Sequence, residues 1–153
     1  TNPELLPQNI IPVVQNAMAY LSSRSSKKVN FVLNLPQDTE IILPINQCLI
    51  EWTLENLSKN AIDAMGGIGT LTLDLTQDSK RVFIDVSDTG KGMPKKQFKK
   101  VFEAGFTTKE RGWGMGLSLA KRIIEEYHHG KIFVKQSTIN RGTTFRIVLK
   151  KEE

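Results

Sequence analysis

The sequence contains a single cysteine, few aromatic residues and no long hydrophobic segment. Cys48 is the only cysteine among the 153 residues, which excludes an internal disulfide and a cysteine metal cage. No hydrophobic run approaches the roughly 18 residues of a membrane-spanning helix, and no signal segment stands at the start. Aromatic residues make up 7% of the chain and are not interleaved with its basic residues, so nucleic-acid binding is not expected.

What is present is typical of one globular domain spanning residues 1–153. Hydrophobic residues make up 39% and charged residues 24%, and the length allows a core to form without disulfides or metals. A single cysteine fits a reducing compartment, so the cytoplasm is the expected location. The chain starts at Thr1, which indicates a fragment, and an inner-membrane anchor elsewhere in the parent protein stays open. We expect this domain to be monomeric and to make no direct membrane contact.

The net charge of +5 comes from scattered basic residues with one local cluster at Lys95, Lys96, Lys99 and Lys100. The plain interpretation is a solvated basic surface. A modest positive excess also suits an anionic ligand such as a nucleotide.

Hydrophobic periodicity and turn residues predict a two-layer sandwich. Residues 1–12 contain three prolines and are expected to be an irregular linker from a missing N-terminal domain. The expected helices are Val13–Ser23, a helix from the cap Asn46 to about Met65, a short helix over Pro94–Phe102, and one from near Met115 that ends before Gly130. The expected strands are Lys27–Leu35, Glu40–Leu43 with Pro44 as its stop, Thr70–Thr76, Arg81–Ser87, Lys131–Gln136 and Thr143–Leu149. This order predicts a mixed sheet with three helices on one face.

The helix after Asn46 places three polar residues on one face. At about 100° per residue, Asn56, Asn60 and Asp63 fall within roughly a 60° arc. They lie beside a hydrophobic stripe that should face the sheet, formed by Ile50, Leu54, Leu57, Ala61 and Ala64. The residues expected on the solvent flank are Glu51, Glu55 and Ser58. Amide oxygens four residues apart suit a magnesium shell completed by water and phosphate, although two polar residues on a hydrated helix face are the simpler interpretation.

A buried acid followed by glycines is expected where the strand Arg81–Ser87 ends. Val82, Ile84, Val86 and Asp88 alternate with period two, so Asp88 continues an inward-pointing row. A buried acid needs a hydrogen-bond donor, and an adenine amino group is one. The following Gly90 and Gly92 allow a flat ring to approach the backbone, and Met93 can pack on that ring. By itself the pattern also fits an ordinary glycine turn.

A glycine cluster at Gly112, Gly114 and Gly116 precedes the last helix. Free N–H groups at a helix start bind phosphate, helped by the helix dipole. The dinucleotide fingerprint and the P-loop pattern both fail here, because no strand leads into Gly112 and no Gly-Lys-Ser/Thr follows. Residues 102–111 contain Lys109 and are expected to close over a triphosphate as a lid. A glycine-rich surface loop remains the alternative for this segment alone.

Taken together and in this order, these segments resemble the GHKL superfamily of ATP-binding domains, which includes gyrase, heat-shock chaperone, histidine kinase and MutL-type proteins. The resemblance runs from Ile45 to Leu149 and covers these boxes: Asn56 to Ala64; Asp88-Thr-Gly90-Lys-Gly92; Val101 to Lys109, similar to the phenylalanine box of histidine kinases; Gly112-x-Gly114-x-Gly116-Leu117; and Gly142-Thr143-Thr144-Phe145. It implies an α+β fold, a two-layer sandwich (the Bergerat fold) with a mixed, mostly antiparallel sheet backed by three helices. It also implies ATP and Mg²⁺ as the bound groups.

The resemblance also implies roles for individual residues. By position, Asn60 is the magnesium ligand, Asn56 and Lys59 contact phosphates, and Asp88 holds the adenine amino group, partly through water. The implied catalytic residues are Asn56, Asn60 and Lys109. The other implied ATP-binding residues are Asp63, Gly90, Gly92, Met93, Phe102, Phe106, Thr107, Thr108, Gly112, Trp113, Gly114, Met115, Gly116, Leu117 and Thr143. Departures at Trp113, Met115 and Asp63 leave the kinase subgroup open.

Position 56 favours the kinase branch of the superfamily over the ATPase branch. The gyrase, chaperone and MutL-type members carry a water-activating glutamate four residues before the magnesium asparagine. This chain has Asn56 there, and an amide does not accept a proton at neutral pH. Glu55 is about 100° round the helix and is not expected to replace it. A site without that base should hydrolyse ATP poorly and keep the γ-phosphate for another acceptor.

The phospho-accepting histidine of such a kinase is expected outside this chain. His128 and His129 are the only histidines, and at a helix C-terminus they are interpreted as cations that favour the dipole. The implied partners are a histidine-bearing dimerisation domain of the same kinase and a response regulator with an acceptor aspartate. The open alternatives are a serine/threonine kinase of anti-sigma type, an ATP-driven clamp, and a non-catalytic nucleotide-binding module.

Overall fold

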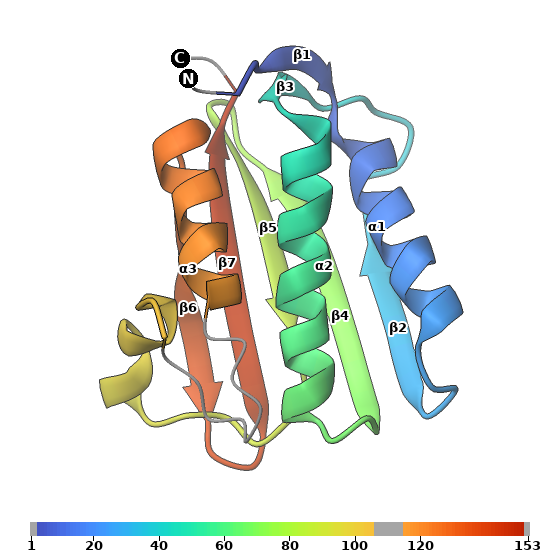
Figure 1. The fold of residues 1–153 in the computed structure, drawn as a ribbon. Helices are drawn as coiled ribbons and strands as arrows, with labels where there is room; N and C mark the ends of the chain where they lie inside the picture. The colour runs from blue at the N-terminus through green and yellow to red at the C-terminus, as the bar shows by residue number, and fades with distance from the viewer. Residues whose placement is uncertain (1–2, 106–114, 152–153) are drawn as a thin grey trace.

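Three helices cover one face of a five-stranded sheet in the computed structural model, which describes residues 3–105 and 115–151, with only the backbone of residues 115 and 116 (Figure 1). The helical segments are α1 (Ile10–Arg24), α2 (Gln47–Ala64), the 3-10 turns η1 (Lys95–Gln97) and η2 (Lys100–Phe102), α3 (Met115–Arg122) and its π-helical continuation η3 (Ile123–Tyr127). The strands are β1 (Leu6–Asn9), β2 (Val29–Asn34), β3 (Ile42–Ile45), β4 (Gly69–Gln77), β5 (Arg81–Ser87), β6 (Lys131–Thr138) and β7 (Gly142–Lys150).

The five-stranded sheet has the order β2-β4-β5-β7-β6. The pair β2–β4 is parallel, and the other three pairs are antiparallel. This confirms the expected α+β sandwich with a mixed, mostly antiparallel sheet and three helices. The short helix expected over Pro94–Phe102 is instead two separate 3-10 turns.

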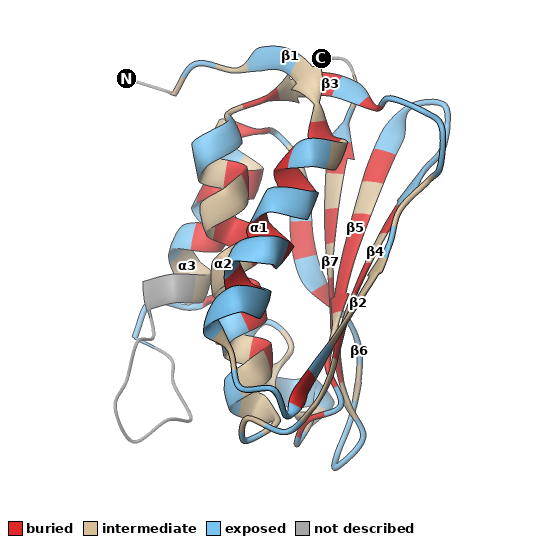
Figure 2. Ribbon diagram, turned by 90° about the vertical axis from the view of Figure 1, so that its right-hand side faces the viewer, coloured by how far each residue is buried: buried red, intermediate tan, exposed pale blue. Residues whose placement is uncertain are grey.

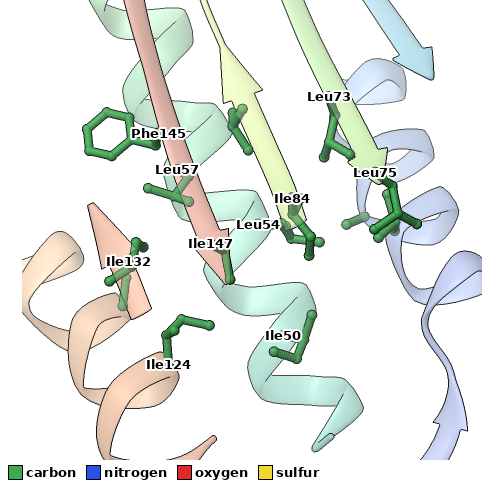
Figure 3. Packing of buried hydrophobic residues seen from close by; sticks show 14 of the residues in the cluster. Ile50, Leu54, Leu57, Leu73, Leu75, Ile84, Ile124, Ile132, Phe145 and Ile147 are labelled. Atoms are coloured by element: carbon green, nitrogen blue, oxygen red, sulfur yellow. The ribbon is translucent and has the colours of Figure 1, made fainter. Parts of the chain in front are cut away.

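The core lies between the helices and the inner face of the sheet (Figure 2). The hydrophobic stripe of α2 packs there as predicted, with Ile50, Leu54 and Leu57 at 1% exposure or less, close to Ile84 and Ile147 of the sheet (Figure 3). Burying each such side chain contributes about 1.5–3 kcal/mol. Helix α2 is therefore held firmly on one side, and its polar face has a defined position.

Ser58 departs from the expected solvent flank of α2. It is fully buried, and its hydroxyl has no hydrogen-bond partner within the described residues. Four residues after Leu54, it is rotated by only about 40° from that core residue, so it shares the hydrophobic stripe. The expectation of a solvated Ser58 is wrong, because the buried stripe is wider than the hydrophobic residues alone indicate.

The N-terminal segment is more ordered than its prolines predict. Residues 6–9 form β1, which pairs antiparallel with β3 in a separate two-stranded sheet and places Pro7 opposite Pro44. In a two-stranded sheet each strand has an open edge, where a residue without an N–H is tolerated. Pro44 therefore lies inside β3 and does not stop it. The expectation that all of residues 1–12 are irregular is wrong.

Asparagine side chains cap the first two helices. The Oδ1 of Asn9 accepts hydrogen bonds from the N–H of Ile11 at 3.2 Å and of Ile41 at 3.0 Å. The predicted cap Asn46 accepts from Leu49 N at 3.1 Å. Both caps satisfy backbone donors that the helix itself leaves unpaired.

His128 is a buried, hydrogen-bonded residue rather than an exposed cation. It is 5% exposed; its Nε2 accepts from the N–H of Asn46 at 3.1 Å, and its Nδ1 lies 2.8 Å from the carbonyl oxygen of Ile123. These partners require a neutral ring with the proton on Nδ1. Burial lowers the pKa of His128, and this outweighs the hydrogen bond to Ile123. The interpretation of His128 as a cation is wrong, because the ring packs against the start of α2.

Acidification is expected to destabilise the fold through His128. The pKa of its ring is lower in the folded chain than the ordinary 6.5, so the unfolded chain binds the proton more tightly. The stabilisation is fully present above pH 6.5 and is lost as the pH falls through the folded pKa, by up to about 1.4 kcal/mol per pH unit. Urea unfolding across pH 5 to 8 measures this slope. The His128→Gln variant keeps a donor and an acceptor but does not titrate there, and an equal slope in this variant would contradict the assignment.

Candidate functional site

Asp88 occupies a buried position just beyond the end of β5. The inward row predicted for Val82, Ile84 and Val86 is confirmed, since each is at most 1% exposed, and Asp88 is 8% exposed. Its Oδ1 accepts hydrogen bonds from Gly90 N at 2.8 Å and Thr143 N at 3.2 Å. Its Oδ2 accepts no hydrogen bond from the residues that the structure describes. One carboxylate oxygen is thus held in place, and the other is a candidate acceptor for a ligand.

The electrostatics of Asp88 favour such a donor. Burial raises the pKa of its carboxyl, and the hydrogen bonds from Gly90 and Thr143 compensate only in part. A buried carboxylate that lacks partners gains from any further hydrogen bond donated to it. An amino group that approaches Oδ2 would stabilise the ionised form.

The glycines beside Asp88 are required by the packing of the loop itself. A Cβ on Gly90 would lie 2.5 Å from the carbonyl oxygen of Ala64, at the end of α2. A Cβ on Gly142, which has φ of 126°, would overlap the carbonyl oxygen of Asp88. A Cβ on Gly92, with φ of 69°, would overlap the carbonyl oxygen of Thr138. The loop is therefore pressed between α2 and the β6–β7 turn, a reason for glycine that the sequence did not reveal.

The polar face of α2 ends against this loop. The N–H of Lys91 donates to the carbonyl oxygen of Ala64 at 3.0 Å, which joins the loop to the last turn of α2. Asn60 lies one turn earlier, half-buried, and its side chain makes no hydrogen bond with the described residues. The Nδ2 of Asn56 donates to the carbonyl oxygen of Trp52 at 2.9 Å, and its Oδ1 keeps no partner among the described residues. The structure thus brings the predicted asparagines to the same end of the molecule as Asp88.

Of the other polar residues predicted on α2, Lys59 and Asp63 are exposed. No group of three or more potential His, Cys, Asp or Glu ligands occurs within residues 3–105 and 115–151. The metal ligands that Asn56 and Asn60 offer on this face are amide oxygens. Such ligands suit a magnesium ion that takes most of its coordination from phosphate and water. The face therefore fits a metal that arrives with a nucleotide and does not supply a complete protein cage.

Met93 and Thr143 are linked by Ser137, a residue that the sequence analysis did not single out. The Oγ of Ser137 accepts from Met93 N at 2.8 Å and lies 2.7 Å from the hydroxyl oxygen of Thr143. Since Thr143 N also donates to Asp88, one hydrogen-bonded chain runs from Met93 to the carboxylate. No local sequence signal marked Ser137, because the expected strand ended at Gln136.

Phe102 is part of the hydrophobic core. It is 7% exposed and meets Phe145 edge to face, with ring centroids 5.9 Å apart, while the Nζ of Lys121 lies 5.6 Å from its ring centroid. Leu117, at the start of α3, is half-buried and packs against the same core. The two residues anchor the segments on either side of residues 106–114, and a direct contact of either with nucleotide stays a prediction.

Several predicted residues lie outside the described part of the chain. They are Phe106, Thr107, Thr108, Lys109, Gly112, Trp113 and Gly114. Met115 and Gly116 fall within the bounds of α3. The ATP-binding roles assigned to all nine remain predictions.

A second buried aspartate lies on the opposite face of β5. Asp85 is 8% exposed and receives two hydrogen bonds from Arg146, at 2.7 and 2.8 Å, and one from Lys135 at 3.4 Å. Burial raises its pKa, but the hydrogen bonds and charges of Arg146 and Lys135 outweigh burial and hold the pKa below its ordinary value. Counting only partners among the described residues, Asp85 is fully paired and Asp88 is not, which separates a structural carboxylate from a candidate ligand-binding one.

None of the described helices is long and apolar enough to cross a membrane.

Known proteins are similar to this chain over most of its length. Residues 46–153 match the family described as "Histidine kinase-, DNA gyrase B-, and HSP90-like ATPase". Sporulation kinase A of Bacillus subtilis is 31% identical over 94% of this chain and 23% of its own length. The nucleotide-free catalytic domain of the histidine kinase ThkA is 26% identical, with a TM-score of 0.87 over 98% of this chain and 97% of that one.

A further structure shows ThkA in complex with the response regulator TrrA. The matched chain of that structure is 24% identical, with a TM-score of 0.82 over 96% of this chain and 42% of the matched one. The chain spans about a quarter of the length of the curated relatives it matches.

Proposed function

We propose a phosphoryl-transfer function for this chain, which belongs to the histidine kinase-, DNA gyrase B- and HSP90-like ATPase family and, within it, to the catalytic domains of sensor histidine kinases. The domain binds ATP with Mg²⁺ and donates the γ-phosphoryl group to a histidine on a separate dimerisation domain. From there the group passes to an aspartate of a response regulator. The domain covers residues 1–153, and the histidine-bearing domain precedes it in the parent protein.

The observation that carries this proposal is the half-paired carboxylate of Asp88. Two backbone N–H groups hold Oδ1, so the direction of Oδ2 is fixed before any ligand binds. A site that hydrogen-bonds an exocyclic amino group discriminates strongly against a base that lacks it, because the buried acceptor is then left unpaired. Guanine has a carbonyl oxygen where adenine has its 6-amino group, so an acceptor at Oδ2 favours adenine over guanine.

The asparagine face of α2 supports metal-dependent phosphate binding. Asn60 lies one turn before the end of the helix that meets the Asp88 loop, and its amide oxygen is unengaged among the described residues. Magnesium bound with the nucleotide supplies charge neutralisation on the phosphate oxygens. Asn56, whose Nδ2 is held by Trp52, would contribute its free Oδ1 or a water-mediated contact to the same group.

The absence of a base at position 56 supports transfer over hydrolysis. Asn56 is an amide and does not activate water, so a bound triphosphate is expected to persist until an imidazole from the partner domain approaches. Within this chain His128 cannot be that imidazole, since it is buried and both of its ring nitrogens are hydrogen-bonded. The ThkA complex with a response regulator supports the proposed downstream partner.

The reducing cytoplasm is the proposed compartment. Cys48 is an exposed free thiol, a form that persists where thiols are kept reduced. The cytoplasm also contains the ATP that the proposed reaction consumes.

Transfer to a separate histidine is the expected result of a reconstitution. The chain is incubated with [γ-³²P]ATP, Mg²⁺ and the histidine-bearing domain of its parent protein. Label should appear on that domain as an acid-labile, base-stable phosphohistidine, with little label on the chain itself and little free phosphate. The matched control is the same domain with its acceptor histidine replaced by alanine.

Other outcomes of this experiment identify the competing functions. Acid-stable label on a protein substrate would indicate serine/threonine phosphorylation. Rapid release of free phosphate would indicate an ATPase. Bound nucleotide with no labelled product would indicate a non-catalytic module, and each of these results contradicts the proposed histidine kinase.

A further inference from the structure

We propose that Ser137 is a positioning residue for base recognition, brought to the inner face of the sheet by a bulge in β6. The inference rests on the proposed nucleotide-binding function and adds a residue to it. Ser137 does not need to touch the nucleotide. It acts through Met93 and Thr143, the two predicted base-pocket residues to which its hydroxyl is hydrogen-bonded.

The bulge changes which residues of β6 face the helices. Ile132 pairs with Ile147 and Val134 with Phe145, and all four are buried on the helix side of the sheet. A register shift between Val134 and Gln136 then inserts one extra residue. Beyond it, Ser137 pairs with Thr143. An odd-numbered residue thereby takes the inner face that even-numbered residues occupy before the bulge.

The inserted residue, Lys135, is held on the opposite face. Its Nζ lies 3.4 Å from the Oδ2 of Asp85, which belongs to the ion pair with Arg146. The bulge is therefore anchored on one side of the sheet by charge and on the other by the Ser137 hydroxyl. Without the bulge, Gln136 or Thr138 would occupy the inner face near Thr143.

The Ser137 hydroxyl joins two strands and one loop. Its oxygen accepts from Met93 N at 2.8 Å, and its proton can go to the Thr143 hydroxyl at 2.7 Å or to the carbonyl oxygen of Gly142 at 3.3 Å. Thr143 N then donates to Asp88. The backbone at Met93 and the carboxylate of Asp88 are thus held at a fixed separation through this one side chain.

Loss of the Ser137 hydroxyl should weaken the binding of the base more than the binding of the phosphates. Removing it leaves the N–H of Met93 without its acceptor and frees the Thr143 hydroxyl. The nearby loop contacts at Lys91, which donates to Ala64 and accepts from Asn140 N at 2.7 Å, remain in place. Only the part of the loop at Met93 is expected to shift, and the asparagine face of α2 is left intact.

The test measures how tightly the Ser137→Ala variant binds two ligands, one that contains a base and one that does not. Isothermal titration measures the Kd of a non-hydrolysable ATP analogue and of tripolyphosphate, each with Mg²⁺. The Ser137→Ala variant is expected to bind the ATP analogue roughly tenfold more weakly and tripolyphosphate as tightly as the unchanged chain. Ser137→Thr, which keeps a hydroxyl, should recover most of the lost affinity.

Ser87 provides the matched control. Its Oγ lies 2.8 Å from the hydroxyl oxygen of Thr144, and the two residues form a cross-strand pair on the opposite face of the sheet from Ser137. Ser87→Ala should therefore cost similar stability and leave both affinities unchanged. Equal ATP-analogue binding by Ser137→Ala and the unchanged chain overturns the inference, as does an equal loss for both ligands. If the unchanged chain binds neither ligand, the proposed function itself has failed, and the inference falls with it.

Discussion

Replacing Asp88 by asparagine is expected to weaken adenine-nucleotide binding roughly a hundredfold without loss of stability. The asparagine Oδ1 can still accept from Gly90 and Thr143, so the loop keeps its two backbone hydrogen bonds. Its Nδ2 then faces the ligand with a donor where the carboxylate presented an acceptor, which opposes an amino group. Since burial raises the pKa of Asp88, the ionised form is unfavourable in the folded chain. A neutral isostere should therefore leave the melting temperature equal or higher at pH 7.

Asp85→Asn is the matched control, with the same chemical change three residues earlier, on β5. Asp85 is paired with Arg146 and Lys135, so the substitution removes the negative charge and one of the two acceptor oxygens from a half-buried guanidinium and should cost about 1–3 kcal/mol. Nucleotide affinity should fall far less than in Asp88→Asn, because Asp85 lies on the opposite face of β5 and is linked to the site only through Lys135 in the β6 bulge. The two variants thus have opposite expected signatures in titration and in thermal unfolding. Unchanged nucleotide affinity in Asp88→Asn would remove the main support for the proposed site.

Replacing Asn60 by alanine is expected to abolish the magnesium-dependent part of nucleotide binding and to reduce phosphoryl transfer at least roughly a hundredfold. The Asn60 side chain makes no hydrogen bond within the described structure and is only half-buried, so the fold loses little when it is shortened. Alanine is also the better helix former. Stability should therefore stay the same or rise slightly while activity is lost.

The measurement for Asn60 is the Kd of ADP with Mg²⁺ and with EDTA. In the unchanged chain Mg²⁺ should tighten binding, and in Asn60→Ala the two values should converge at the magnesium-free affinity. Asn16→Ala, an exposed asparagine of α1, tests the same substitution away from the site and should behave like the unchanged chain. A full magnesium response in Asn60→Ala would assign the metal to other ligands.

The features of the site that could be predicted from sequence are those set by local geometry. The inward row ending at Asp88 follows from the period of two in a strand, and the position of Asn56 beside Asn60 follows from the turn of a helix. The cap at Asn46 depends on residues three positions apart and formed as expected. Such features need no knowledge of which segments meet.

Two of the errors share one physical origin, which is pairing between distant segments. β1 was missed because Pro7 and Pro44 oppose strand formation locally, and only their antiparallel pairing makes both tolerable. His128 was taken for a surface cation because nothing near it in sequence indicates Asn46, its partner 82 residues away.

The sequence alone determined the fold class and the chemical character of the site: the order of helices and strands, the buried acid and the asparagine face. Tertiary structure alone decided how that acid is held and how the loop at Met93 is braced. Thr143 reaches Asp88 across 55 residues, and Ser137 reaches Met93 across 44 because a bulge shifts the register of β6 by one residue. These contacts depend on the relative placement of whole strands, which side-chain periodicity within any one strand does not encode.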